Sequence, residues 1–242
     1  SNPTLRVADV TGIAGLAAAH GALLVVDNTF TTPAMFRPME HGADIVINSI
    51  TKFLAGHSDV TLGYVAARDP GLRTAIYDAA VTWGTTPSPF DCWLAKRGLH
   101  TFDLRFEKAQ ATAASLADAL AGRDGIRQVI YPGRADHPHH NRAGTLFGGQ
   151  FGNMLSFEIE GGRDEVNSFV MNAGGIPFAP TLGDVGCTLS HPASSSHRAL
   201  TEEGRAALGI SEGYFRLSVG IEPPELVLAE LDAALAAVRG ES

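Results

Sequence analysis

The chain has 242 residues, 45% of them hydrophobic and 18% charged, which is the balance of a globular protein with one large domain or slightly more. A net charge of −8 with only 18 basic residues argues against nucleic-acid binding, and no apolar run is long enough to cross a membrane. Cys92 and Cys187 lie far apart, so we expect no disulfide framework, no metal site and a cytoplasmic location.

The first predicted element is a helix over residues 5–20. One face carries Val7, Val10, Ile13, Leu16 and Ala17 at helical spacing, and Gly21 follows as a C-cap. No strand or glycine-rich turn precedes this helix, although a phosphate site usually needs both. We therefore expect the chain to be part of a longer protein.

Two apolar strands follow, and each runs into polar residues. The first covers residues 23–26 and leads into Asp27, and the second covers residues 44–47 and leads towards Lys52. A third strand is expected over residues 60–66. Because helices alternate with strands here, we predict βαβ units and a largely parallel, buried sheet. Asp27 and Lys52 then emerge at one edge, where α/β proteins bind ligands.

Further elements are expected along the whole chain, and after Gly122 strands and helices alternate in longer, more widely separated pieces. We expect helical segments over residues 35–41, 69–80, 88–99, 101–120, 164–173 and 224–238, and strands over residues 126–131, 154–159 and 215–219. The helix over 101–120 has few breakers and can link two domains. We therefore predict an α/β protein with two parts. Residues 1–103 form the remainder of a large domain with a mainly parallel sheet, and residues 104–242 form a smaller α+β domain.

An acid, two hydroxyls and a lysine at one sheet edge favour a phosphorylated cofactor with a basic ring nitrogen and an aldehyde, which describes pyridoxal 5′-phosphate (PLP). Lys52 can form an imine with the aldehyde, and Asp27 can keep the ring nitrogen protonated. Ser49 and Thr51 alternate around Ile50 and can donate to phosphate oxygens. Taken singly, each has an ordinary alternative: a surface lysine, a turn-forming aspartate or a small polar loop.

Three further features are compatible with more than one interpretation. Arg216 is a candidate for bidentate capture of a substrate carboxylate, although its spacing favours a salt-bridged strand arginine. The polar stretch 181–197 either faces an active site or forms a surface loop, and Cys187 within it is more readily a small buried residue than a reactive thiol. Histidines among residues 137–140 suggest a metal, but Pro138 favours the start of a helix.

Together these residues resemble the Cys/Met-metabolism family of PLP enzymes. That family contains cystathionine γ-synthases, cystathionine γ-lyases, methionine γ-lyases and O-acetylhomoserine sulfhydrylases. The resemblance implies an α/β fold of the PLP fold-type I (aspartate aminotransferase-like) class. The matching stretches follow the family's order through the chain and cover residues 2–5, 26–30, 42–46, 49–53, 56–60, 97–99, 191–194 and 216–222.

The resemblance implies a role for each cofactor-binding position. Lys52 corresponds to the catalytic lysine that forms the Schiff base with PLP. Asp27 corresponds to the partner of the ring nitrogen, and Thr29 lies against the ring. Ser49 and Thr51 correspond to phosphate ligands.

It also implies how the amino-acid substrate is held. Arg216 corresponds to the anchor of the α-carboxylate, and Thr181 lies next to that carboxylate. Asn2 is expected near both the phenolic oxygen of PLP and the substrate carboxylate. Gly186 stands where many lyases carry an acidic residue, which leaves the substrate preference open.

The reaction that the resemblance favours is γ-elimination on methionine or cystathionine, giving 2-oxobutyrate, ammonia and a thiol. The alternative is γ-replacement on an O-acylated homoserine, and a catalytically inactive binding or regulatory subunit is a third. The resemblance further implies a homotetramer built from two dimers. The family's amino-terminal portion, which supplies a glycine-rich phosphate loop and a ring-stacking tyrosine, has no counterpart here, so we expect this chain alone to bind PLP poorly.

Overall fold

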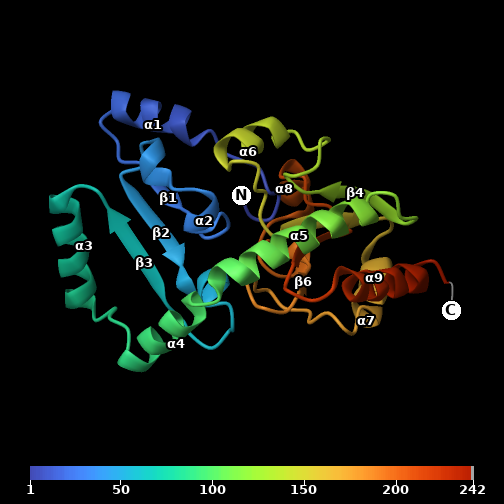
Figure 1. Ribbon diagram of the computed structural model, residues 1–242. Helices are drawn as coiled ribbons and strands as arrows, with labels where there is room; N and C mark the ends of the chain where they lie inside the picture. Colours follow the sequence, from blue (N-terminus) through green and yellow to red (C-terminus); the bar gives the residue numbers. More distant parts are fainter. Residues whose placement is uncertain (241–242) are drawn as a thin grey trace. The chain divides into compact units, whose positions relative to one another are not determined.

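A computed structural model describes residues 1–240, which form two compact units (Figure 1). The first unit comprises Ala8–Leu104. The second unit comprises Ser1–Val7 together with the chain from Arg105 onward. The predicted domain limits, 1–103 and 104–242, stay a prediction, but the first seven residues pack with the second unit.

The first unit contains a three-stranded sheet in the order β1-β2-β3. Its strands are β1 (Val25–Asp27), β2 (Ile45–Ser49) and β3 (Gly63–Ala67). Its helical segments are α1 (Val10–Ala19), α2 (Thr32–Met35), η1 (Pro38–His41), η2 (Ile50–Leu54), α3 (Pro70–Trp83) and α4 (Pro89–Leu99). In the chain, α2 follows the carboxyl end of β1, and η2 follows the carboxyl end of β2.

The sheet of the first unit is mixed. Strands β1 and β2 pair in parallel, as the alternation of elements predicts, with Val25 opposite Ile45. The expectation of a largely parallel sheet is wrong for β3, which runs antiparallel to β2 with Ser49 opposite Gly63. The connection after β2, residues 50–62, contains only the single helical turn η2 in place of the α-helix that usually forms a parallel crossover.

The first helix is shorter than its apolar periodicity predicts. It begins at Val10 because the side chain of Asp9 accepts a hydrogen bond from the backbone N–H of Gly12 and caps the helix. Val10 is its buried residue, whereas Ile13 and Leu16 of the predicted apolar face are exposed.

The second unit contains a four-stranded antiparallel sheet in the order β4-β5-β7-β6. Its strands are β4 (Ile126–Ile130), β5 (Met154–Ile159), β6 (Thr188–Ser190) and β7 (Tyr214–Ser218). Its helical segments are α5 (Phe102–Leu120), which begins in the first unit, α6 (His140–Leu146), α7 (Arg163–Asn172), η3 (Pro192–Ser194), α8 (Glu202–Ala207) and α9 (Pro224–Val238). Sequence periodicity missed β6 and α8 because both are short and lie in polar stretches.

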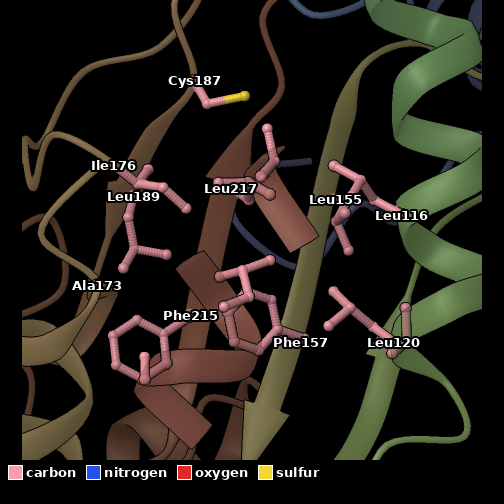
Figure 2. Packing of buried hydrophobic residues seen from close by; sticks show 14 of the residues in the cluster. Leu116, Leu120, Leu155, Phe157, Ala173, Ile176, Cys187, Leu189, Phe215 and Leu217 are labelled. Carbon is pink, nitrogen blue, oxygen red and sulfur yellow. The ribbon is translucent and has the colours of Figure 1, made fainter. Parts of the chain in front are cut away.

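One face of this sheet forms the hydrophobic core. Leu155, Phe157, Phe215 and Leu217 of β5 and β7 belong to it, and Figure 2 shows them with Leu116 and Leu120 of α5 among other members of the cluster. Apolar residues of α7 and α9 belong to the same cluster. Burying one such side chain stabilises a fold by about 1.5–3 kcal/mol, so the apolar positions of β7 fix which way its other positions point.

The described residues include no helix long and apolar enough to cross a membrane.

Candidate active site

The carboxyl ends of β1 and β2 bring Asp27, Thr29 and Ser49 together. Asp27 ends β1 and Ser49 ends β2, and the parallel pairing places both at one edge of the sheet. The backbone N–H of Ser49 donates to the hydroxyl oxygen of Thr29 at 2.9 Å. The carboxylate of Asp27 accepts the N–H of Thr29, also at 2.9 Å. The two strand ends are thus tied by polar contacts between the predicted residues themselves.

Lys52 lies in the irregular turn that follows β2. Segment η2 has the wide hydrogen bonding of a π-helical turn, in which the N–H of Ala55 donates to the carbonyl of Ile50. Lys52 leaves helical geometry within it, with φ −82° and ψ −127°. Such single π-turns occur frequently at functional sites, because they redirect one side chain away from the regular helical positions. The Lys52 residue is half-buried.

The hydroxyl of Thr51 is already engaged by the protein. It donates to the carbonyl of Leu62 at 3.2 Å and accepts the N–H of Leu62 at 2.8 Å. A hydroxyl has one hydrogen to donate. Thr51 must therefore release Leu62 before it can donate to a phosphate oxygen, which makes Ser49 the simpler phosphate ligand of the predicted pair.

A cavity of about 740 Å³ opens at this edge of the sheet. Its lining includes Asp27, Thr29, Ser49 and Thr51, all predicted from the sequence. Within the described part of the chain, Lys52 is not among the residues that line it. Further polar residues that the sequence did not single out also line the cavity, beside several apolar ones, namely Asn48, Thr61, Tyr64, Thr85, Thr86 and Asp91.

In the second unit, Arg216 projects from the face of β7 opposite the hydrophobic core. Its guanidinium donates to the side-chain oxygen of Asn2 at 2.7 Å and to the backbone carbonyl of Thr181 at 2.8 Å. The structure thus brings together the three residues expected at the substrate carboxylate. Spacing alone does not predict this cluster, since 214 positions separate Asn2 from Arg216, whereas the family resemblance implied it.

Arg216 is a buried cation. Only 4% of the residue is exposed, its Nε has no hydrogen-bond partner, and no carboxylate within residues 1–240 forms an ion pair with it. Burial lowers the pKa of its guanidinium. The expectation from spacing, that Arg216 is a salt-bridged strand arginine, is therefore wrong. An unpaired buried charge is costly, and such a group is set up to receive an anion.

The segment after Thr181 is fastened to the end of β7. The N–H of Gly183 donates to the hydroxyl of Ser218 at 2.9 Å. Cys187 donates its N–H and its thiol to the carboxylate of Glu222. Burial is the main reason that the pKa of this thiol rises to about 12, so Cys187 is the buried residue that the sequence favoured and not a reactive thiol.

Gly186 lies beside the same carboxylate. A Cβ at this position would stand 3.4 Å from Oε1 of Glu222. An acidic side chain here would meet a like charge, which gives a local reason for glycine at this position.

The histidines near residue 140 hold backbone groups. Nδ1 of His139 accepts the N–H of Val7 at 3.0 Å, and Nδ1 of His137 accepts the N–H of His139 at 3.1 Å. His140 begins α6, in agreement with the helix start that Pro138 favours. Within residues 1–240 no group of three or more potential ligand side chains is arranged to hold a metal ion.

The sequence matches the model of one protein family, the Cys/Met metabolism PLP-dependent enzymes, over residues 1–236. The chain belongs to this family. It is 42% identical to cystathionine β-lyase MetC of Bacillus subtilis over 97% of its length and 60% of that protein's. It is 40% identical to L-methionine γ-lyase of Pseudomonas putida over 98% of its length and 60% of that protein's.

Solved structures agree with this assignment. A crystal structure of cystathionine γ-synthase from Xanthomonas oryzae pv. oryzae, in complex with aminoacrylate and cysteine, matches with a TM-score of 0.94 and 44% identity. The match covers all of this chain and 62% of that one. The fold is therefore that of the fold-type I PLP enzymes, as expected. The chain spans about 60% of the length of the curated relatives that it matches.

The residues at the edge of the first unit's sheet fit the family's cofactor. PLP carries a ring nitrogen, a phosphate and an aldehyde. The cavity wall offers a carboxylate in Asp27 and hydroxyls in Thr29, Ser49 and Thr51, and Lys52 follows Thr51 directly. Oxygen Oδ1 of the buried cavity residue Asn48 has no partner within the described chain, which leaves a further polar atom in this wall for a ligand. The individual roles remain a proposal.

Proposed function

We propose that the protein cleaves the carbon–sulfur bond of a sulfur amino acid by γ-elimination. With methionine the balance is methionine and water to 2-oxobutyrate, ammonia and methanethiol. With cystathionine, cysteine replaces methanethiol as the product. Family membership supports chemistry on sulfur amino acids with PLP, and the buried Arg216 supports recognition of an amino-acid carboxylate.

The single observation that carries substrate recognition is the uncompensated charge of Arg216. Its guanidinium contacts two neutral acceptors, Asn2 Oδ1 and Thr181 O. A carboxylate supplies the negative charge that these acceptors lack, and arginine binds carboxylates through paired, charge-assisted hydrogen bonds. Asn2 and Thr181 then hold the guanidinium in position for that contact.

Lys52 is proposed as the residue that moves protons. When bound, PLP supplies an electron sink that stabilises negative charge at the substrate α-carbon. Lys52 removes the proton from the α-carbon and then one from the β-carbon. The electrons released at the β-carbon expel the thiol from the γ-carbon, and the departing sulfur takes up a proton.

Asp27, Ser49, Thr29 and Thr51 are proposed to hold the cofactor. The carboxylate of Asp27 keeps the ring nitrogen protonated, which maintains the electron sink. Ser49, with Thr51 once it releases Leu62, donates to the phosphate, and Thr29 lies against the ring. We further propose that the protein works as a homotetramer of two dimers in the cytoplasm on small amino-acid substrates.

The second candidate is γ-replacement on an O-acylated homoserine with cysteine or sulfide. The observation that favours it is the Xanthomonas oryzae structure, a cystathionine γ-synthase at 44% identity. The 42% identity to a cystathionine β-lyase requires that the assay also detect β-elimination, which forms pyruvate and homocysteine from cystathionine.

The deciding experiment supplies the full-length protein with PLP and gives it methionine, cystathionine, and O-acetylhomoserine with cysteine or sulfide in turn. The proposal expects 2-oxobutyrate and a thiol from methionine or cystathionine. If O-acetylhomoserine gives cystathionine or homocysteine and little 2-oxobutyrate forms, γ-replacement is the function instead. Pyruvate formed from cystathionine would establish a β-lyase. Absence of bound PLP and of every product would leave an inactive subunit.

A further inference from the structure

Strand β7 carries three polar residues on the face opposite the hydrophobic core. Tyr214, Arg216 and Ser218 alternate with Phe215 and Leu217, which face the core. All five residues are buried, so the polar face of the strand is covered as well as the apolar one. Two backbone segments, residues 1–7 and residues 181–183, supply partners for these polar side chains.

The first segment is fixed one residue away from Asn2. The carbonyl of Pro3 accepts the hydroxyl of Tyr214 at 2.9 Å and the hydroxyl of Ser156 at 3.0 Å. A carbonyl oxygen has two lone pairs, so these donors saturate it. Tyr214 and Ser156 are fully buried, and Ser156 lies opposite Arg216 in the β5–β7 register. The contact therefore sets where Asn2 meets Arg216.

The second segment is fixed two residues from Thr181. The N–H of Gly183 donates to the buried hydroxyl of Ser218, while the carbonyl of Thr181 accepts from Arg216. Each neighbour of Arg216 on this face thus holds the backbone that carries one of its two acceptors. Burial raises the pKa of Tyr214 to about 12, so its phenol keeps the proton that it donates.

We propose that Tyr214 and Ser218 are positioning residues for carboxylate recognition: they fix the segments that carry Asn2 and Thr181, and thereby aim the guanidinium of Arg216. This inference rests on the proposed role of Arg216 as the carboxylate anchor. Neither residue is required to touch the substrate. Removing either contact loosens a segment, and part of the binding energy must then reorder it.

The variants are Tyr214→Phe and Ser218→Ala in the full-length, PLP-loaded protein, with Tyr131→Phe as the matched control. Tyr131 is also a buried tyrosine of the second unit, and its hydroxyl donates to a backbone carbonyl, that of Gly152. It contacts neither segment through that bond. The binding probe is L-norleucine, which resembles methionine in shape but has no sulfur to eliminate, and L-norleucine amide lacks the carboxylate.

We expect Tyr214→Phe and Ser218→Ala each to weaken L-norleucine binding, followed through the cofactor absorbance, by about threefold to tenfold, the range for one net hydrogen bond. Binding of the amide stays within twofold. With methionine or cystathionine as substrate, KM rises while kcat changes little. Amide hydrogen exchange without substrate speeds up in residues 1–7 for Tyr214→Phe and in residues 181–186 for Ser218→Ala. Tyr131→Phe alters none of these quantities.

Faster exchange in these segments with unchanged L-norleucine binding would overturn the positioning role. Unchanged exchange in both variants would overturn the structural basis of the inference. Arg216→Lys tests the carboxylate anchor separately from the positioning residues. If this variant binds L-norleucine as the unaltered protein does, the proposed anchor is wrong, whatever the exchange data show.

Discussion

The side-chain oxygen of Asn2 lies 2.7 Å from a guanidinium nitrogen of Arg216, although the two residues stand near opposite ends of the chain. Asn2 reaches this position because Pro3 is bound by β5 and β7 and Val7 is bound by His139 and Arg142. The amino-terminal seven residues are thus a structural part of the second unit, and they supply one of the two acceptors of its buried cation.

Asn2→Asp should raise stability and weaken substrate binding together. A carboxylate at position 2 would form an ion pair with Arg216, and this pair would stabilise the fold. The same pair would compete with the substrate carboxylate for the guanidinium. We expect a higher thermal midpoint and a KM at least about tenfold higher, corresponding to the loss of about 1.4 kcal/mol or more of a charge-assisted contact. The control is Asn172→Asp, since Asn172 is exposed on α7. Equal KM values for the Asn2 variant and the unaltered protein would contradict the role of Arg216.

Lys52→Ala should abolish turnover and the covalent attachment of PLP. An alanine has no amine to form the imine or to move protons. Treatment with borohydride followed by peptide mass analysis should locate the cofactor on residue 52 of the unaltered protein and nowhere in the variant. Lys96→Ala, on α4, is the control and should keep both properties. A cofactor label retained in Lys52→Ala would show that another lysine carries it.

Gly98→Ala should destabilise the first unit next to the Lys52 turn. A Cβ on Gly98 would clash with the carbonyl oxygen of Ala55 and lie 2.8 Å from its Cα, so α4 can approach the end of η2 only at a glycine. We expect a loss of about 1–3 kcal/mol in the free energy of unfolding, measured by urea titration. Gly15→Ala in α1 is the matched control, since a Cβ there meets nothing within 4 Å and should stabilise the helix by up to about 1 kcal/mol. A neutral Gly98→Ala would refute the close approach.

The protein should lose stability as pH falls below about 6.5. Burial, followed by the nearby His139, lowers the pKa of His137 below the ordinary value of a histidine. The unfolded chain therefore binds a proton at a higher pH than the folded chain does. The contribution of His137 is present above pH 6.5 and is lost as pH falls through the folded-state pKa, because protonated Nδ1 can no longer accept the N–H of His139.

His137→Asn tests this dependence, because an amide oxygen can accept the same N–H and does not titrate. We expect the fall in the urea midpoint between pH 8 and pH 5 to be smaller in this variant, while the exposed His100→Asn keeps the full fall. His139 and His191, whose pKa values are also lowered chiefly by burial, contribute to the remaining dependence. An identical pH profile in His137→Asn would exclude His137 as a contributor.

Much of the first unit follows from local sequence. The apolar runs before Asp27 and Ser49 predict β1 and β2, and glycine and proline mark the limits of most helices, because these signals act over a few residues. The antiparallel direction of β3 does not follow from them, since strand direction depends on how the chain returns after Lys52. Motifs along the whole chain, among them the one around Lys52, indicated the family, which the match over residues 1–236 then established.

The sequence by itself determined the residue types of the candidate site, namely a lysine, an aspartate, two hydroxyls and an arginine at recognisable positions. Only the tertiary structure decided the surroundings of Arg216. Alternation along β7 puts Tyr214, Arg216 and Ser218 on one face, and that face is covered because the first seven residues pack there. The spacing within the strand favoured a salt bridge for Arg216. In the described chain the side chain is instead buried without a carboxylate partner, because segments that are distant in the sequence pack around it. The burial of a side chain and its choice of partners depend on packing across the whole unit, so a local sequence pattern does not predict them.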